Sequence, residues 1–585
     1  MITVEKLSYS FPEKDLYKDV SFTLEDGQHA VLIGSNGTGK TTLIHMLMNP
    51  DDFLYDGKIK RDIEGRIGYV SQFEKEEKER DLTVFEFLAE DFVALQKDME
   101  EVCKEMETAE DLDPLMERYQ AILDESMSMD ADNYESNIRK ELKTAGLTQL
   151  EELKISAISG GEYKLLQVVK QMLRMPSLLI MDEPDVFLDF ENLNGLRDLV
   201  NSYKGTLLAI THNRYLLNHC FNKILHLENA DIQEFEGSFV EYNFSLLAQK
   251  IELQEQVAKE QAEIERNEKI VEKLRANATV VTSASRGKAL HARVSYLERL
   301  EARRIKAPFV NLRQPKIVLP VLEVAEAEEE KAKVLEVSGY TVAYDELLLE
   351  NVNFELREGD KVAIVGPNGT GKTTLLRDIY KNDSGFIALS DDARVGFLSQ
   401  IHGEMLKESN TIYEEMECIG FETHGQIAEY LKDYYFEVDM LGNKIEQLSG
   451  GEKNLLQLAK ICAGDANILL LDEPTSHLDT YSQIALEKAI EKYNGTVLMV
   501  SHDFYTIANC VDYVLFVEDK SIRKMRIRSF RKMIYDNHFD KDYLELEQKK
   551  KELETRVENL LQNNDYATAK VVCEDLEAVV SKMKV

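Results

Sequence analysis

Short apolar runs recur along the chain, and each ends in a polar motif of fixed composition. VLIG runs into SNGTGKTTL from Val31, and VAIVG runs into PNGTGKTTL from Val362. LLIM ends in DEP at Pro184, and LLLL ends in DEP at Pro474. Uninterrupted apolar runs of this length are typical of strands that are buried on both faces, and helix-compatible stretches follow them. The pattern predicts an α/β fold with two P-loop domains in one chain.

The motifs occur in the same order in both halves, which indicates an internal duplication. ISGGE begins at Ile158 and LSGGE at Leu448, while THN begins at Thr211 and SHD at Ser501. From the serine of SGGE to the glutamate of DEP is 24 residues in both halves, and from that glutamate to the histidine is 29. Chance does not produce matching order and spacing, so two copies of one domain are expected.

The two glycine-rich loops have the spacing GxxxxGKT of a phosphate-binding loop. Glycines let backbone N–H groups converge on phosphate oxygens, and the dipole of the helix that follows favours the same charge. Lys40 and Lys372 are expected to reach the β- and γ-phosphates, and Thr41 and Thr373 to bind Mg²⁺. The expected ATP-binding residues are Gly34, Ser35, Asn36, Gly37, Thr38, Gly39, Lys40, Thr41 and Thr42, with Gly366, Pro367, Asn368, Gly369, Thr370, Gly371, Lys372, Thr373 and Thr374 in the second half.

Polar residues that follow other strand-like runs complete the predicted sites. They come in four pairs: Asp182 and Asp472, Glu183 and Glu473, His212 and His502, and Gln72 and Gln400. We expect the aspartates to hold Mg²⁺ through water and the glutamates to polarise the attacking water. The histidines are placed to sense the γ-phosphate, and the glutamines to contact the metal and the nucleophile. The predicted cofactors are therefore ATP and Mg²⁺, and the predicted activity is ATP hydrolysis.

The two halves resemble ATP-binding cassette (ABC) ATPase domains, whose signature is SGGE. In that family two cassettes pair head to tail, and each ATP lies between one P-loop and the signature of the other cassette. The resemblance implies that Lys40 shares a nucleotide with Ser449, Gly450 and Gly451, and Lys372 with Ser159, Gly160 and Gly161. It also implies that an upstream aromatic stacks on adenine. Phe11 and Tyr344 are at the matching positions, and Tyr9 and Tyr340 are alternatives.

The composition suggests a folded cytoplasmic protein of several domains. The chain has 585 residues, which is several times the usual domain size. The N-terminus has no basic and apolar leader pattern, and no run of 18 apolar residues occurs. The six cysteines form no CxxC pair, so neither a disulfide framework nor a zinc site is expected. The formal net charge is −37, so any contact with nucleic acid must be made by a local basic segment.

Two inserted segments distinguish the chain from a plain pair of cassettes. The interval from Gln72 to Ser159 is 38 residues longer than the interval from Gln400 to Ser449, and two acidic helix-compatible runs around Asp113-Pro114 account for the excess. We expect a helical arm at about 92–135. Between the halves, Val257, Ile264 and Val271 recur every seven residues, and so do Leu246 and Leu253. With Leu290, Val294 and Leu297 beyond NATVVTSAS, the pattern predicts an antiparallel helical hairpin at 243–318.

The hairpin is strongly basic on its second side. Residues from Lys273 to Lys316 include eleven Lys or Arg and two Glu, in a chain with a large acidic excess. Such a local excess is typical of a surface that binds a phosphate backbone. The predicted RNA-binding residues are Lys273, Arg275, Arg286, Lys288, Arg293, Arg303 and Arg304.

Two cassettes with an arm in the first and a basic hairpin between them resemble the ABC-F family of translation-associated ATPases. The resemblance implies a ribosomal partner, with the hairpin entering the exit (E) site and its tip approaching the peptidyl-transferase centre and the peptidyl-tRNA. It further implies either protection of ribosomes against antibiotics or relief of stalled translation. It also implies that the two cassettes of one chain pair with each other in a monomer. Two alternatives stay open: an ABC ATPase that binds DNA junctions, and the ATPase subunit of a transporter.

The predicted organisation is a first cassette at 1–242, the hairpin at 243–318, a second cassette at 335–535 and a helical extension at 536–585. RKMRIRSFRK, from Arg523 to Lys532, holds six basic residues, whereas QEFEGSFVEY in the first half is acidic. A second RNA contact and a solvated strand edge are both compatible with that run. The second half has DEPTSHLD where the first has DEPDVFLD, so the two ATP sites are not expected to be equivalent.

Overall fold

The computed structural model describes the chain except residues 12–13, 63–64, 73–80, 110, 187, 281–313, 321–330, 345–346, 422, 539–540 and 584–585. Its contacts divide the described residues into two compact units. The first unit comprises 1–236 and 314–538 and contains both cassettes. The second comprises 237–313 and 539–585.

Each cassette is built on a six-stranded sheet, as the apolar runs predict. The first sheet has the order β5-β6-β7-β3-β8-β9, with β5 (Ile67–Val70), β6 (Leu178–Asp182), β7 (Thr206–Ile210), β3 (His29–Ile33), β8 (Lys223–Glu228) and β9 (Asp231–Glu236). The second has the order β14-β15-β16-β12-β17-β18, with β14 (Val395–Leu398), β15 (Ile468–Asp472), β16 (Thr496–Val500), β12 (Lys361–Val365), β17 (Tyr513–Glu518) and β18 (Ser521–Arg526). All neighbours are parallel except the last pair in each sheet. Every residue of β6, β7, β15 and β16 is buried, because helices cover both faces. The α/β fold with two P-loop domains is confirmed.

The antiparallel edge strands differ in charge between the two halves. β9 carries Asp231, Glu234 and Glu236, whereas its counterpart β18 carries Arg523, Lys524 and Arg526. The three arginine and lysine side chains are exposed to solvent. The duplication therefore preserves the strand and reverses its charge.

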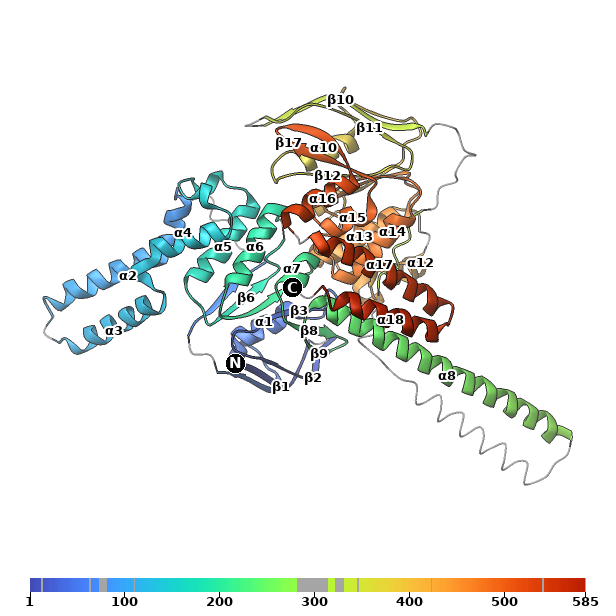
Figure 1. Ribbon diagram of the computed structural model, residues 1–585, viewed down its shortest axis with the longest axis horizontal. Helices are drawn as coiled ribbons and strands as arrows, with labels where there is room; N and C mark the ends of the chain where they lie inside the picture. The colour runs from blue at the N-terminus through green and yellow to red at the C-terminus, as the bar shows by residue number, and fades with distance from the viewer. Residues whose placement is uncertain are drawn as a thin grey trace. The chain divides into compact units, whose positions relative to one another are not determined.

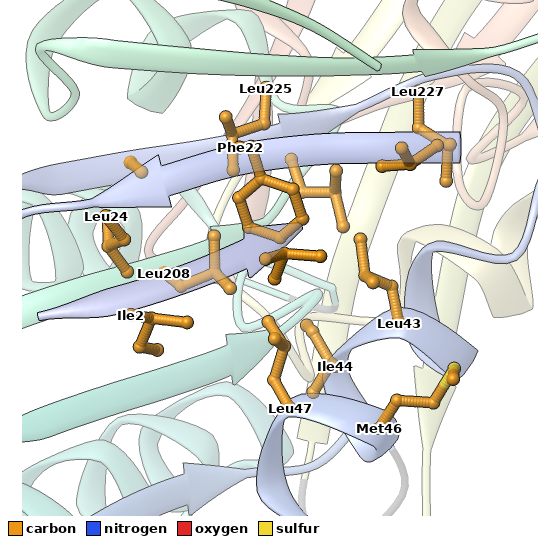
Figure 2. Packing of buried hydrophobic residues seen from close by; sticks show 14 of the residues in the cluster. Ile2, Phe22, Leu24, Leu43, Ile44, Met46, Leu47, Leu208, Leu225 and Leu227 are labelled. Atoms are coloured by element: carbon orange, nitrogen blue, oxygen red, sulfur yellow. The ribbon is translucent and has the colours of Figure 1, made fainter. Parts of the chain in front are cut away.

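A three-stranded antiparallel sheet supplements each cassette and encloses the first helix. These sheets have the orders β2-β1-β4 and β11-β10-β13, with β2 (Lys14–Leu24), β1 (Ile2–Phe11), β4 (Asp56–Arg61), β11 (Leu347–Arg357), β10 (Lys333–Ala343) and β13 (Ile387–Leu389). Figure 2 shows Ile2, Phe22 and Leu24 of the first small sheet facing Leu43, Ile44 and Leu47 of α1 (Lys40–Met48), with Leu208, Leu225 and Leu227 from the large sheet. Each such buried side chain contributes about 1.5–3 kcal/mol. This core fixes α1, and therefore the loop before it, against both sheets.

Several helices carry or adjoin the residues expected to form the site. In the first cassette these are α5 (Gly160–Leu173), α6 (Phe190–Ser202) and α7 (Arg214–His219). In the second they are α10 (Lys372–Lys381), α13 (Gly450–Ala463), α14 (Thr480–Lys492) and α15 (Phe504–Cys510), followed by α16 (Ile527–His538). In the sequence of the repeats, α5, α6 and α7 correspond to α13, α14 and α15, and α1 corresponds to α10.

The helical arm of the first cassette is formed by α2 (Val84–Met106) and α3 (Asp113–Ser128), which lie side by side (Figure 1). α2 begins eight residues before the expected start, because Thr83 and Glu86 form a reciprocal capping box. Pro114 is in the first turn of α3, where its missing N–H costs no hydrogen bond. α4 (Tyr134–Thr144) then leads back to the cassette.

The second unit consists of α8 (Phe239–Val280), α17 (Lys541–Gln562) and α18 (Tyr566–Val580) (Figure 1). The two C-terminal helices are separated at Asn563 and Asn564, as the sequence indicates. Ile251 of α8 packs against Val557, Leu561, Ala569 and Val572 of α17 and α18, and Lys570 pairs with Glu255. Of the expected heptad positions, Leu246, Leu253 and Val271 are buried, but Val257 is 39% exposed. The expected second helix of the hairpin falls within 281–313, outside the described residues.

Candidate functional site

Each P-loop connects a central strand to a helix and folds around its own lysine. The Lys40 Nζ donates to the carbonyl oxygens of Gly34 at 2.9 Å and Ser35 at 3.0 Å. Lys372 does the same with Gly366 at 2.9 Å and Pro367 at 2.6 Å. Burial lowers the pKa of both ammonium groups. Phosphate oxygens bound beside them would supply negative charge and so favour their protonated form.

The turn into the first helix depends on glycine in a left-handed conformation. Gly39 and Gly371 are the N-caps of α1 and α10, with φ of 97° and 88°. A Cβ on Gly39 would lie 2.9 Å from the Tyr17 hydroxyl, which donates to the Gly39 carbonyl at 2.6 Å. Tyr17 is a support of the loop that the sequence reasoning missed.

An acidic residue at the end of a strand lies beside each P-loop helix. The Thr373 hydroxyl donates to Asp472 Oδ1 at 3.0 Å, and the Thr41 hydroxyl likewise bonds to Asp182. Burial raises the pKa of both aspartates, to about 6 for Asp472. One hydroxyl and one carboxylate form a partial oxygen-ligand set of the kind that Mg²⁺ takes together with phosphate oxygens. Among the described residues, no group of three or more His, Cys, Asp or Glu could hold a metal ion without such help.

The glutamate after each aspartate has a backbone conformation that is rare for its residue type. φ is 47° at Glu183 and 48° at Glu473. Conformations of this kind cost about 1–3 kcal/mol and persist only where the surroundings enforce them, often at functional sites. Gln72 donates to Glu183 Oε2, and the His502 backbone N–H donates to Glu473 Oε2 at 3.3 Å. Gln72 therefore lies beside Glu183, and His502 lies beside Glu473.

The two glutamates have different electrostatic surroundings. Burial acts to raise the pKa of the Glu183 carboxyl, but the His477 imidazole, with His212 and Lys40, lowers it below its ordinary value. Burial and the Asp472 carboxylate raise the pKa of Glu473. His477 belongs to the second cassette, and its Nδ1 lies 3.7 Å from Glu183 Oε2. The equivalent position in the first cassette is phenylalanine, Phe187, which lies outside the described residues.

The SGGE motifs are helix starts. Ser159 accepts a hydrogen bond from the Glu162 backbone N–H while Glu162 accepts one from Ser159, and Ser449 and Glu452 form the same capping box on α13. The two glycines between serine and glutamate have no side chains of their own that could cover the first N–H groups of each helix. A helix N-terminus of this kind favours an anionic ligand.

The cassettes contact each other through equivalent pairs at the two P-loops. The Asn36 backbone N–H donates to Asp479 Oδ2, and the Asn368 backbone N–H donates to Asp189 Oδ2, both at 3.2 Å. The Asn36 side chain also donates to the His477 carbonyl at 2.8 Å. Sequence reasoning missed both aspartates, although each stands directly before the helix that it caps.

A cavity of about 770 Å³ connects the residues expected to form the Lys372 site. It is lined by the P-loop of the second cassette, Gln400, Glu473 and His502, and by Ser159, Gly160 and Gly161 of the first. Gln72, Glu183 and His212 also line it. In the other site, a Cβ on Gly451 would lie 2.2 Å from Asn36 Nδ2, so that signature is already against the opposite P-loop.

Other residues singled out from the sequence are placed as follows. Phe11 and Tyr344 are 49% and 70% exposed, so both rings are free to stack on a base. Tyr340 is buried and donates to Asp378, which removes it as an alternative. Tyr9 packs against Tyr17 and Phe53.

Asp185 is the unusual residue of the first DEPD motif. Burial raises the pKa of its carboxyl to about 6. One carboxylate oxygen has no hydrogen-bond partner in the part of the chain that the structure describes. It lines the same cavity as the Lys372 P-loop.

The predicted RNA-binding residues are largely outside the structure. Arg286, Lys288, Arg293, Arg303 and Arg304 fall within 281–313, outside the described residues. Lys273 and Arg275 lie on the described backbone of α8, but their side chains are not described. Their role stays a prediction from the sequence.

The chain has two P-loops at the ends of buried parallel strands. Each P-loop has an acidic strand end beside it and a capped SGGE helix across from it. This arrangement defines a tandem ATP-binding cassette ATPase. A family model described as ABC transporter matches residues 17–186 and 349–476, and a second one so described matches 225–317. ABC transporter F family member 2 of Arabidopsis thaliana is 30% identical over 535 residues, which cover 88% of this chain and 76% of the relative. The chain belongs to the ABC-F family, and it is an ATPase.

A further relative is similar over most of its length, and a solved structure shares the fold. The energy-dependent translational throttle protein EttA of Escherichia coli K12 is 29% identical over 523 residues, which cover 87% of this chain and 90% of the relative. The archaeal ribosome recycling factor aABCE1, solved with the ribosomal stalk protein aP1, has the same fold, with a TM-score of 0.55, 18% identity and 92% of each chain covered. Among the described helices, none has a stretch long and apolar enough to cross a membrane.

Proposed function

We propose that this ABC-F ATPase binds the ribosome in its ATP-bound state and inserts the linker between its cassettes at the E site, toward the peptidyl-transferase centre. Binding there protects the ribosome from antibiotics or relieves stalled translation. The observation that carries the ATP-dependent part is the pairing of each P-loop with the other cassette, at Asn36 with Asp479 and Asn368 with Asp189. An ATP molecule that contacts both cassettes would hold them together. Binding of ATP would therefore favour the apposed arrangement of the cassettes, and its hydrolysis would release them.

The catalytic roles follow from position and charge. Lys40 and Lys372 would exchange their own loop carbonyls for phosphate oxygens. Mg²⁺, when bound, would neutralise charge on the phosphates. In the first cassette Thr41, Asp182 and Gln72 would hold it. In the second cassette Thr373, Asp472 and Gln400 would do so. Glu183 and Glu473 orient and deprotonate the attacking water, because each carboxylate lies beside its strand-end aspartate.

His212 and His502 fit the role of γ-phosphate sensors in the neutral form. Burial lowers the pKa of His502 to about 3, and burial likewise lowers that of His212. A neutral imidazole donates one hydrogen bond to a phosphate oxygen without adding a buried charge. Both side chains line the cavity that contains the Lys372 P-loop.

The ribosomal part of the proposal rests on charge and on relatives. The segment from Lys273 to Lys316 is basic in a chain of net charge −37, which favours a phosphate backbone. A relative at 29% identity is named as a translational throttle protein. The ribosome, with its rRNA and peptidyl-tRNA, is thus the proposed partner. The proposed location is the cytoplasm. The proposed state is a monomer in which the two cassettes pair with each other.

The test is retention on ribosomes. Glu183→Gln with Glu473→Gln keeps the size of each side chain and removes both bases, so ATP binds and is not cleaved. This double variant should co-sediment with 70S ribosomes in ATP and lose the signal in ADP. Glu191→Gln with Glu491→Gln, on exposed helix positions, is the matched control and should behave as the unmodified protein.

Two outcomes would reject parts of the proposal. ATP cleavage at the original rate in the double variant would remove the assignment of both glutamates. Binding to branched DNA but not to ribosomes would replace the ribosomal partner with a DNA junction. Antibiotic susceptibility of a sensitive host with and without the gene then separates ribosome protection from relief of stalled translation.

A further inference from the structure

Arg214 of the first cassette is buried against acidic residues of the second. It is the first residue of α7, two positions after His212, and only 11% of its side chain is exposed. Its Nη2 donates to Glu487 of α14 and to Asp503 Oδ2, the latter at 2.9 Å. The guanidinium carbon also lies 4.9 Å from the centre of the Tyr505 ring.

Arg214 supplies positive charge to two carboxylates that also share a neutral donor. The Thr506 hydroxyl lies 2.9 Å from Glu487 Oε1 and 2.9 Å from Asp503 Oδ2. A hydroxyl has a single proton and can donate to only one of the two acids at a time. Glu487 also accepts from Asn509 Nδ2 at 3.0 Å, but neither of these donors carries a positive charge. Without Arg214, two carboxylates would remain close together in a buried place, where like charges repel strongly.

Asp503 connects this cluster to the second ATP site. It directly follows His502, and its side chain caps α15 by accepting from the Tyr505 and Thr506 backbone N–H groups. The His502 backbone N–H in turn donates to Glu473 Oε2 at 3.3 Å. A displacement of Asp503 therefore moves His502 and the Glu473 carboxylate with it.

Among the described residues, the positions in register with this cluster in the other half do not form it. The two halves align without gaps from the SGGE serine to the histidine, and this register places Phe504 opposite Arg214, Asn213 opposite Asp503, and Arg197 opposite Glu487. Phenylalanine cannot form an ion pair. Arg197 bonds to Tyr215 and Asp198 within its own cassette.

We propose that Arg214 is a positioning residue which acts from the first cassette on the His502 loop, so that the Glu473 site hydrolyses ATP only while the cassettes are apposed. The dependence through this cluster concerns the Glu473 site, because the described residues in register with it in the other half are Phe504, Asn213 and Arg197. This inference rests on the proposed roles of Glu183 and Glu473. It deepens them by assigning control of one site to a side chain of the opposite cassette.

The experiment measures single-turnover ATP cleavage at each site separately. In a Glu183→Gln background, where only the Glu473 site cleaves, Arg214→Met should slow the reaction by about tenfold to a hundredfold, since small displacements of catalytic groups have such effects. Arg214→Lys, which keeps the charge, should recover part of the rate. In a Glu473→Gln background the same substitutions should change the rate by less than about threefold, because the ion pairs of Arg214 are with Glu487 and Asp503, which belong to the Glu473 half.

A second arm separates positioning from folding. Glu487→Gln with Asp503→Asn removes the repulsion that Arg214 offsets, so adding Arg214→Met to this pair should cost little further rate. Arg174→Met, which breaks an ion pair with Asp91 inside the first cassette, is the matched control and should leave the Glu473-site rate unchanged.

Three results would overturn the inference. Equal losses in both backgrounds would make the cluster a general interface contact. An unchanged Glu473-site rate in Arg214→Met would leave the ion pairs without a catalytic role. A full further loss in the triple variant would show that Arg214 does not act through the two carboxylates. Cleavage that persists in Glu183→Gln with Glu473→Gln would instead reject the glutamate assignment.

Discussion

The His477 imidazole of the second cassette lies 3.7 Å from the Glu183 carboxylate of the first, within ion-pair range. In the sequence, Phe187 is the first-half counterpart of His477, so only the second half has a histidine at this position. Glu473 has the imidazole of its own cassette beside it instead, because His502 Nε2 lies 3.5 Å from Glu473 Oε1. The direction of the pKa shift differs accordingly, being downward for Glu183 and upward for Glu473. The electrostatic surroundings of the two glutamates are therefore unequal.

His477→Phe should therefore slow the Lys40 site more than the Lys372 site. The substitution copies the phenylalanine of the first half and removes the partner that holds Glu183 ionised, so we expect about a tenfold loss in single-turnover rate. The rate is measured in a Glu473→Gln background, and the Glu183→Gln background is the control. Equal effects in the two backgrounds would contradict the assignment.

Gly451→Ala should prevent apposition at the Lys40 site. The added Cβ would lie 2.2 Å from Asn36 Nδ2 and 2.5 Å from the His477 carbonyl oxygen, and backbone cannot move aside easily. A Cβ on Gly160 meets nothing within 4 Å, so Gly160→Ala is the matched control. We expect a loss of at least about tenfold at the Lys40 site for the first variant, and less than about threefold at the Lys372 site for the second. Similar rate losses in the two variants would show that each added methyl group interferes with nucleotide contact, and that the clash with Asn36 is not the cause.

Buried His226 should make the first cassette acid-sensitive. Burial lowers the pKa of its imidazole from 6.5 to about 3, so the folded state stays neutral where the unfolded chain takes up a proton. Stability is then present above pH 6.5 and is lost as the pH falls toward 3, with a loss of about 2 kcal/mol at pH 5. His226→Phe keeps a ring beside Tyr481 and should flatten this dependence. Denaturant midpoints at pH 8 and pH 5 test it, and parallel shifts in both proteins would exclude His226 as the cause.

The C-terminal helices should depend on their contacts with α8. Val572 is 3% exposed and packs in the cluster around Ile251, whereas its neighbour Val571 is 60% exposed. Val572→Ala should lower the free energy of unfolding of this unit by about 1–2 kcal/mol and speed proteolysis of α17 and α18. Val571→Ala is the control and should change neither. If both variants are cut at the unmodified rate, the packing does not stabilise these helices.

Charge reversal at Arg286, Lys288 and Arg293 should weaken ribosome binding and flatten its dependence on salt. Each lost phosphate contact should lower the slope of log affinity against log salt by about one unit at most. Reversal of Lys250, Lys259 and Lys269, in the mixed-charge part of the linker helix, is the control and should have a smaller effect. Basal ATP turnover should stay near normal in both, and an unchanged slope would contradict an RNA contact at these residues.

Elements that depend on local sequence could be predicted, and contacts between distant segments could not. The P-loops, the strand-end acids and the paired histidines follow from short motifs with equal spacing. The contact of His477 with Glu183 and the ion pairs of Arg214 require two segments that are far apart in sequence to meet, and no local pattern encodes that meeting. The early start of α2 is an intermediate case, because the Thr83–Glu86 capping box is local but lies before the acidic run that indicated the arm.

The reversed charge of β9 and β18 gives the duplicated molecule a polarity. Two identical cassettes would present the same edge twice, and a charged surface could not distinguish one half from the other. Here the equivalent edges carry Asp231, Glu234 and Glu236 in one half and Arg523, Lys524 and Arg526 in the other. In the field of a polyanion, the edge of the second cassette is attracted and that of the first is repelled. Two identical copies would present equal edges to a polyanion. The six charged side chains on these two strands make the edges electrostatically different, so that a polyanion favours one cassette over the other.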